Sequence, residues 1–451
     1  MTAFVILVFI LGYLAIVLEH PLHLDKTVPA LIMGALCWAL LSIGFHAGSL
    51  EVIDTHDHIF SMLSGDHDEA EYGFINALLH HLGKTAEILV FLIGAMTIVE
   101  IIDLHRGFEI LKSWVNTRSR KKLLWIIGIL AFILSAIIDN LTATIVLVTL
   151  LRKLFDERSD RIWYASMVVI AANAGGAWSP IGDVTTTMLW IGKKVSTGGL
   201  VQALVIPSIV CFIVPFVIAS YLPQFKGEID KKEDEGDNFQ LLSSKSMLFI
   251  GLGSIVFVPI FKTYTHLPPY LGMMLSLGVV WLISEYIHPE EDFTEERKHL
   301  YSPHKALSRI EMSSILFFLG ILMAVGALET MVMGGVGTLR FLAEGLENSI
   351  PNRDVVVMLL GVGSAIIDNV PLVAASMGMY TEAMDSKLWH FIAFAAGTGG
   401  SMLIIGSAAG VAAMGMEKID FIWYLKKITW LAATGFVAGS IVFLMLAKYI
   451  F

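Results

Sequence analysis

SAIIDN occupies residues 135–140 and recurs letter for letter at residues 364–369. Both copies lie inside long apolar stretches, where a carboxylate is costly and therefore usually functional. The repeat places an acid and an amide in each half of the chain, as Asp139-Asn140 and Asp368-Asn369. This pattern is typical of a transporter that is built from two related halves, with its binding site at the interface between them.

The overall composition also indicates a membrane protein. Of the 451 residues, 56% are hydrophobic and only 16% are charged, whereas soluble domains are closer to one half and one quarter. Runs of about 20 apolar residues alternate with short charged loops, as in polytopic helical membrane proteins embedded in a lipid bilayer. The net charge of −10 is spread over the loops without a basic stripe, so nucleic acid is not an expected partner. Cys37 and Cys211 lie in apolar spans, where we expect them to pack rather than form a disulfide.

The apolar stretches around the two copies are predicted to be re-entrant hairpins, at residues 123–151 and 355–381. The first has basic residues on both sides, which favours the cytoplasmic face for both of its ends. Two arms of about 14 residues would reach ~20 Å, past the middle of a ~30 Å hydrocarbon core. The second has acidic flanks, as expected at the opposite face.

Each hairpin is followed by an apolar span that contains glycine pairs, at residues 162–191 and 389–416. Glycine pairs, and Pro180 in the first span, weaken a helix near its middle. We therefore expect two broken transmembrane helices, with close packing through small residues as the alternative. The predicted fold class is an all-α polytopic membrane protein of about ten spans plus two hairpins, arranged as two inverted-topology repeats. The predicted repeats cover residues 1–222 and 247–451, and a cytoplasmic linker at 223–246 joins them.

Acids and polar residues of the hairpins and broken helices together predict a cation site. Its carboxylates are Asp139, Asp183 and Asp368. Its neutral oxygens are those of Asn140, Asn369, Thr142, Thr185, Ser364, Ser401 and Ser407. Hard cations prefer oxygen ligands of this kind. No Arg or Lys is predicted at the same depth, so a bulky anion would face three acids, which disfavours an anionic substrate.

The same acids suit an exchange of a cation for protons. A carboxyl group in an apolar site can hold a proton near neutral pH and release it when a metal cation arrives. Asp183 aligns with Ser407, so the first half is the more acidic one. We therefore expect Asp139 and Asp183 to act mainly in exchange, while Asp368 and Asn369 complete the site.

Two further features carry titratable groups. Glu100 has apolar residues on both sides in the third span, and it is a candidate site acid unless it lies near the membrane interface. Residues 46–81 contain six histidines, which we interpret as solvated side chains of an amphipathic helix on the outer surface. An external pH sensor is the alternative, because histidine titrates near neutral pH.

The sequence resembles the NhaD-type sodium/proton antiporters of the ion transporter superfamily over nearly its whole length. The resemblance rests on residues 135–144 (SAIIDNLTAT), 173–187 (NAGGAWSPIGDVTTT), 364–372 (SAIIDNVPL), 397–410 (GTGGSMLIIGSAAG) and 19–29 (EHPLHLDKTVP). It implies a multi-pass protein of the bacterial inner membrane, a homodimer, which exchanges Na⁺ or Li⁺ for H⁺ without any cofactor. It also implies that the cation site contains Asp139, Asp183, Asp368, Asn140 and Asn369, together with Thr185, Ser364 and Ser407.

Two alternatives remain from sequence. The first is a transporter of a small anion, oxyanion or dicarboxylate, because Asn140-Leu141-Thr142 resembles the hairpin-tip Ser-Asn-Thr signature of dicarboxylate transporters in the same superfamily. Asp139 stands where that signature has Ser, which favours a cation instead. The second is an intramembrane aspartyl protease with Asp139 and Asp368 as its dyad, although the usual Gly-x-Gly-Asp signature is not matched before Asp183.

Overall fold

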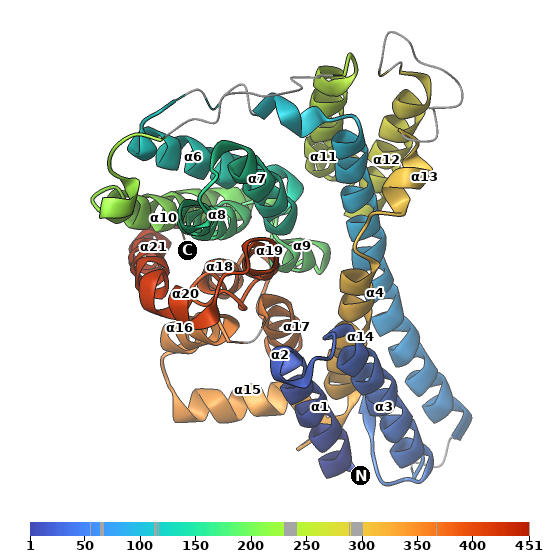
Figure 1. Cartoon of the computed structure of the whole chain (residues 1–451). Coiled ribbons are helices and arrows are strands. Elements are labelled where there is room, and N and C mark those ends of the chain that lie inside the picture. Colours follow the sequence, from blue (N-terminus) through green and yellow to red (C-terminus); the bar gives the residue numbers. More distant parts are fainter. Residues whose placement is uncertain are drawn as a thin grey trace. The chain divides into compact units, whose positions relative to one another are not determined.

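The structure is a computed structural model of the chain. It describes residues 1–54, 56–63, 67–111, 115, 117–229, 241–287, 289, 301–366 and 368–450. Residues 230–240 of the predicted linker lie outside this described part. The described elements are almost all helices, as predicted (Figure 1). The exceptions are two antiparallel strand pairs, β1 (Val52–Ile53) with β2 (Ile59–Phe60) and β3 (Val332–Met333) with β4 (Val336–Gly337).

Seven of the described helices are long and apolar enough to cross a membrane. They are α3 (Thr27–His46), α4 (His67–Leu104), α6 (Arg120–Ile138), α10 (Thr197–Ala219), α11 (Ser244–Thr265), α14 (Met312–Thr330) and α21 (Thr429–Ile450). The remaining predicted spans correspond to α1 (Thr2–Val17), α12 (Pro269–Tyr286) and the pairs α8 (Arg158–Gly176) with α9 (Val184–Ile191) and α18 (Lys387–Gly399) with α19 (Ala408–Glu417). The other hairpin helices are α7 (Asn140–Leu154), α16 (Arg353–Ser364) and α17 (Asn369–Met379). Shorter helices are α2 (Glu19–Leu22), η1 (Gly107–Glu109), η2 (Pro223–Phe225), α13 (Pro303–Leu307), α15 (Thr338–Ser349) and α20 (Phe421–Lys427).

These elements form two compact units, and each unit takes residues from both predicted repeats. The first unit consists of Met1–Val90, Glu311–Val357 and Val370–Ala383. The second consists of Phe91–Ile310, Met358–Asn369 and Met384–Phe451. The predicted hairpin tips and broken helices all belong to the second unit. The repeat boundaries themselves stay a prediction.

The first unit is centred on the packing of α3 against α14. A Cβ atom on Gly34 would lie 2.7 Å from the Gly320 carbonyl oxygen, so glycine at this position lets the two backbones approach closely. Trp38 Nε1 adds a hydrogen bond to the Met323 carbonyl at 2.8 Å. The two helices are therefore held together by close backbone packing and by a side-chain hydrogen bond.

The helix expected over residues 46–81 forms only from His67 onward. The helix α3 ends at His46, β1 and β2 follow, and α4 begins only at His67. The Asp54 carboxylate accepts hydrogen bonds from the backbone N–H groups of His56 and His58, at 2.8 and 2.9 Å. Such a side-chain turn offers the backbone an alternative to a helix, and it lets the chain form a strand pair instead.

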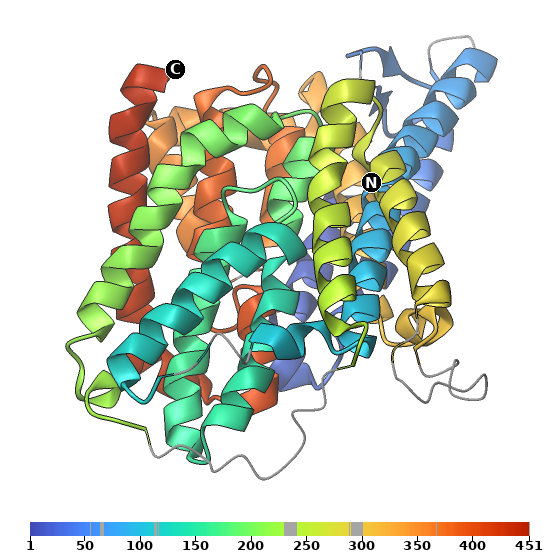
Figure 2. The same cartoon turned by 90° about the horizontal axis from the view of Figure 1, so that it is seen from above.

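In the second unit, α10 packs extensively against α21, and the two helices lie side by side (Figure 2). A Cβ atom on Gly435 would lie 2.5 Å from the Cys211 carbonyl oxygen, and one on Gly439 would lie 2.9 Å from the Pro207 carbonyl oxygen. Small residues thus allow the contact, as is common between membrane helices. Cys211 and Cys37 are both free and buried, as expected for packing residues.

His105 connects three segments of the second unit just after the end of α4. Its Nδ1 lies 2.8 Å from Ser243 Oγ and its Nε2 lies 3.0 Å from Ser284 Oγ. Ser244 Oγ donates to the His105 carbonyl at 2.8 Å. Burial lowers the pKa of the imidazole from 6.5 to about 4. Between pH 6.5 and about 4 the folded state therefore binds fewer protons than the unfolded state. The stability that depends on neutral His105 is complete above pH 6.5 and is lost as the pH falls toward 4.

We expect His105→Gln to remove much of the acid sensitivity of the fold. The full shift corresponds to about 3 kcal/mol of unfolding free energy, which the wild type loses on acidification and the variant does not. Thermal unfolding in detergent at about pH 7.5 and about pH 4.5 measures this difference. An equal loss of stability in the two proteins would show that other groups cause the acid sensitivity.

Candidate functional site

The tip of the first hairpin is a single residue, Asp139, between α6 and α7. Its backbone has φ 80° and ψ 158°, a region that is occupied almost only by glycine and that costs about 1–3 kcal/mol for other residues. Its side chain caps α7, because Oδ1 accepts from Thr142 N and Oδ2 accepts from Thr142 Oγ1, both at 2.8 Å. Strain of this size persists where the surroundings enforce it, and such places are often functional sites.

Both predicted broken helices are confirmed. The helix α8 ends at Gly176 and α9 begins at Val184, while α18 ends at Gly399 and α19 begins at Ala408. The aligned residues Asp183 and Ser407 each cap the second half of their helix. The Asp183 carboxylate accepts from Thr185 N at 2.8 Å, and Ser407 Oγ accepts from Gly410 N at 3.2 Å. The sequence repeat is thus reproduced in the local geometry of the two breaks.

Aligned glycines allow the same close approach at both breaks. A Cβ atom on Gly175 would lie 2.1 Å from the Phe132 carbonyl oxygen, and one on Gly399 would lie 2.1 Å from the Gly361 carbonyl oxygen. No side chain fits at such distances. Helix breakage and small-residue packing, which were alternatives from sequence, therefore occur together.

We expect Gly175→Ala to destabilise the fold by about 3 kcal/mol or more, because backbone must move to admit the methyl group. Gly198→Ala in α10 is the matched control, since a Cβ atom there meets nothing within 4 Å. The fraction of protein that stays monodisperse in detergent after heating would report the difference. Equal behaviour of the two variants would show that the backbone at Gly175 relaxes without cost.

Asp183 is the centre of a buried cluster of amide and hydroxyl groups, and it is only 1% exposed. Thr185 Oγ1 donates to Oδ1 at 2.6 Å, and Asn140 Nδ2 donates to Oδ2 at 2.5 Å. Asn369 Nδ2 lies 3.4 Å from both carboxylate oxygens. Within the described residues, every hydrogen-bond donor to Asp183 is neutral and no Lys or Arg pairs with it. A buried carboxylate without a counter-charge is suited to bind a proton or a cation.

Asn173 of α8 connects the Asp183 cluster to the second half of the chain. Its Oδ1 accepts from Asn140 Nδ2 at 3.0 Å, and its Nδ2 donates to Ser407 Oγ at 2.9 Å. The side chain is fully buried. Asn173 is not among the site residues predicted from sequence, although it begins one of the motifs quoted above. A polar residue just before the glycine pair of an apolar span was the signal that could have found it.

Within the described residues, the remaining predicted site residues do not donate hydrogen bonds to Asp183, and they have different roles. Thr142 binds Asp139, Ser364 Oγ donates to the Ala396 carbonyl at 3.1 Å, and Ser401 Oγ donates to the Thr398 carbonyl at 2.7 Å. Asp368 is half-buried and directly precedes Asn369. The two serine hydroxyls donate to backbone carbonyls, and their oxygen lone pairs remain available as acceptors.

Glu100 belongs to a different group of charges. Its Oε2 lies 4.0 Å from Arg309 Nη1, which also lies 3.3 Å from Asp103 Oδ2. The Glu100 side chain is 29% exposed. In this environment the carboxylate has a cationic partner, unlike Asp183.

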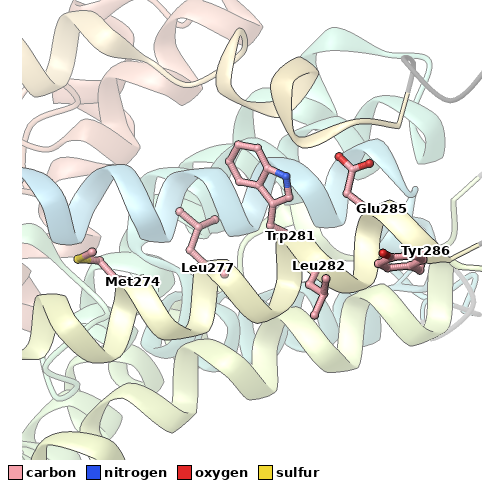
Figure 3. Close-up of a pocket in the computed structure, with 7 residues that line it drawn as sticks. Met274, Leu277, Trp281, Leu282, Glu285 and Tyr286 are labelled. Atoms are coloured by element: carbon pink, nitrogen blue, oxygen red, sulfur yellow. The ribbon is translucent and has the colours of Figure 1, made fainter.

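A surface hollow lies along one helix, α12 (Figure 3). It is lined by Met274, Leu277, Gly278, Trp281, Leu282, Glu285 and Tyr286, and it includes none of the predicted site residues. Its lining is mainly apolar, as expected of a surface that contacts lipid.

The chain is similar to known transporters. Residues 13–399 match the CitMHS family, which is described as citrate transporter. The chain is 45% identical to sodium/proton antiporter 1 of Arabidopsis thaliana, over 97% of this chain and 71% of that protein. It is 30% identical to the Na⁺/H⁺ antiporter NhaD of Vibrio cholerae, over 98% of this chain and 91% of that protein. The YdaH transporter of Alcanivorax borkumensis has a similar fold, with a TM-score of 0.61 at 12% identity over 94% of this chain and 98% of that one.

Proposed function

The chain belongs to the CitMHS transporter family and to the NhaD-type sodium/proton antiporters, and from this membership we propose that it exchanges Na⁺ or Li⁺ for H⁺. The observation that carries the proposal is the buried Asp183 carboxylate, which has only neutral donors around it. Proton and cation compete for these oxygens, so that binding of one releases the other. Because the family consists of transporters, the aspartyl-protease alternative is set aside.

The amides around Asp183 suit both states of such a site. Asn140 and Asn369 direct their Nδ2 atoms at the bare carboxylate. An amide has an oxygen acceptor as well as an N–H donor, so rotation about its last bond would direct oxygen at a bound cation. The same two amide side chains can therefore donate hydrogen bonds to the free carboxylate in one state and offer oxygen atoms to a bound cation in the other. Alternating access of this site to the two faces of the membrane completes the proposed cycle.

Anion transport is the second candidate, because the family is described as citrate transporter. Three acids lie at the hairpin tips and the first break, and the cluster around Asp183 holds no cationic side chain within the described residues. Citrate would therefore meet repulsion with no compensating charge.

We place the protein in the bacterial inner membrane as a homodimer by resemblance alone. The Arabidopsis relatives, at 45% and 41% identity, are more similar to it than the Vibrio antiporter.

Proteoliposomes that contain an internal pH dye test the proposed function. External Na⁺ or Li⁺ should make the interior more alkaline, whereas choline should not. Protein-free liposomes measure the passive leak. Uptake of labelled citrate without any cation-driven proton movement would move the function to the anion alternative.

A further inference from the structure

Glu417, the last residue of α19, is bound by arginines from the end of α7 and the start of α8. Its side chain is only 2% exposed. Arg152 Nε donates to Oε1 at 2.7 Å, and Arg161 Nε donates to Oε2 at 2.9 Å. The carboxylate therefore has a cationic partner on each oxygen.

Arg152 and a third arginine, Arg158, also donate hydrogen bonds to backbone carbonyls at the end of α19. Arg158 Nε donates to the Glu417 carbonyl at 3.1 Å, and Arg158 Nη2 donates to the Lys418 carbonyl at 2.5 Å. Arg152 Nη2 donates to the Met416 carbonyl. The last carbonyls of a helix lack partners within it and carry partial negative charge, which cations stabilise. We call Glu417, Arg152, Arg158 and Arg161 the Glu417 clamp.

The other end of α19 lies at the candidate ion site. The helix begins after Ser407, which receives a hydrogen bond from Asn173 and so connects to Asn140 and Asp183. Its 10 residues correspond to a length of ~15 Å. A short, rigid helix thus joins the clamp to the site, and it lies against α7 and α8 in the same unit (Figure 1).

The aligned half-helix α9 is fastened in a comparable way. It begins after Asp183, and Lys262 Nζ donates to the Trp190 carbonyl near its end at 3.1 Å. The following segment is held by the loop before α18, because Asp385 N donates to the Lys194 carbonyl at 2.9 Å. Each half-helix therefore starts at a site residue, and the chain at its far end binds residues at or just before the start of the other broken helix. Only the α19 end uses a buried carboxylate between two arginines.

We propose that Glu417 is a positioning residue for the cation site. Its carboxylate, held by Arg152 and Arg161, fixes α19 along its axis and thereby fixes Ser407 against Asn173. The inference rests on the proposed function, because its main readout is the dependence on cation concentration. Glu417→Gln keeps the shape but leaves two arginines without their anion, which shifts α19 and weakens cation binding.

The test compares Glu417→Gln with Asp160→Asn. Asp160 forms a two-bond pair with Arg120, at 2.7 and 2.6 Å, between α6 and α8. Asp160→Asn is the matched control, because it also removes a carboxylate from its arginine partner but the pair does not involve α19. We expect Glu417→Gln to raise the Na⁺ concentration for half-maximal proton movement about tenfold. Asp160→Asn should lower the unfolding temperature and leave that Na⁺ concentration unchanged.

Binding is measured separately, as the rise in unfolding temperature of detergent-solubilised protein with added NaCl against choline chloride. The NaCl concentration needed for this rise should also increase in Glu417→Gln. If that variant does not fold, Arg152→Gln replaces it, because the Arg152 side chain is 46% exposed and is less needed for packing. Unchanged Na⁺ dependence in the folded variant would overturn the inference and leave a purely structural clamp. A wild type without any cation-driven proton movement would instead overturn the proposed function.

Discussion

Replacing Asp183 by asparagine is expected to abolish cation-driven proton movement in the liposome assay. The substitution removes the Asp183 charge from the buried cluster while it keeps the shape of the side chain. It also places an amide nitrogen where Asn140 and Asn369 now donate to carboxylate oxygens. We expect a decrease in rate of about 100-fold or more, as for the loss of a group that transfers a proton.

Asp183→Ser separates this loss of charge from a loss of structure. Serine caps the aligned half-helix α19 as Ser407, and it is as good an N-cap as aspartate. The variant should therefore keep α9 and an unfolding temperature near that of the wild type, yet fail to exchange. The rate of dye response and the unfolding temperature are measured on the same preparation. Full pH-dependent exchange in either variant would remove Asp183 from the exchange step.

The breaks and hairpin tips could be predicted from sequence because their causes are local. A glycine pair weakens a helix wherever it stands, and an acid in an apolar stretch is conspicuous by itself. The length of α4 could not be predicted in this way. The apolar stretch around Glu100 predicts a span, whereas the helix that contains it, α4, covers His67–Leu104. Hydropathy does not detect helical residues that are polar enough to leave the membrane.

The hydrogen-bond partners of the site residues could not be predicted from the sequence. Asp183 and Asn140 were expected in one site, but the bridge through Asn173 to Ser407 joins residues that are 234 positions apart. From sequence, the basic residues that follow the hairpin at residues 123–151 indicate only its orientation in the membrane. Their binding of Glu417 depends on a contact across 256 to 265 positions, which no local pattern encodes.

Asp139→Asn should also abolish exchange, and for this position the fold should be nearly unaffected. Asparagine is an equally good N-cap, so the side chain can still accept from Thr142 N. Asparagine has nearly the same shape as aspartate, so the strained backbone at φ 80° and ψ 158° carries no additional strain. We expect an unfolding temperature close to the wild type together with a loss of proton movement of about 100-fold or more.

Asp139→Gly is the complementary variant, because it relieves the strained backbone but removes both the cap and the charge. If charge is what matters, the asparagine and glycine variants lose exchange to the same degree although their stabilities differ. Exchange that survives in Asp139→Asn and is lost in Asp139→Gly would assign Asp139 to hairpin geometry alone. The exchanged proton would then depend on Asp183, and Asp183→Ser would show the larger loss of the two.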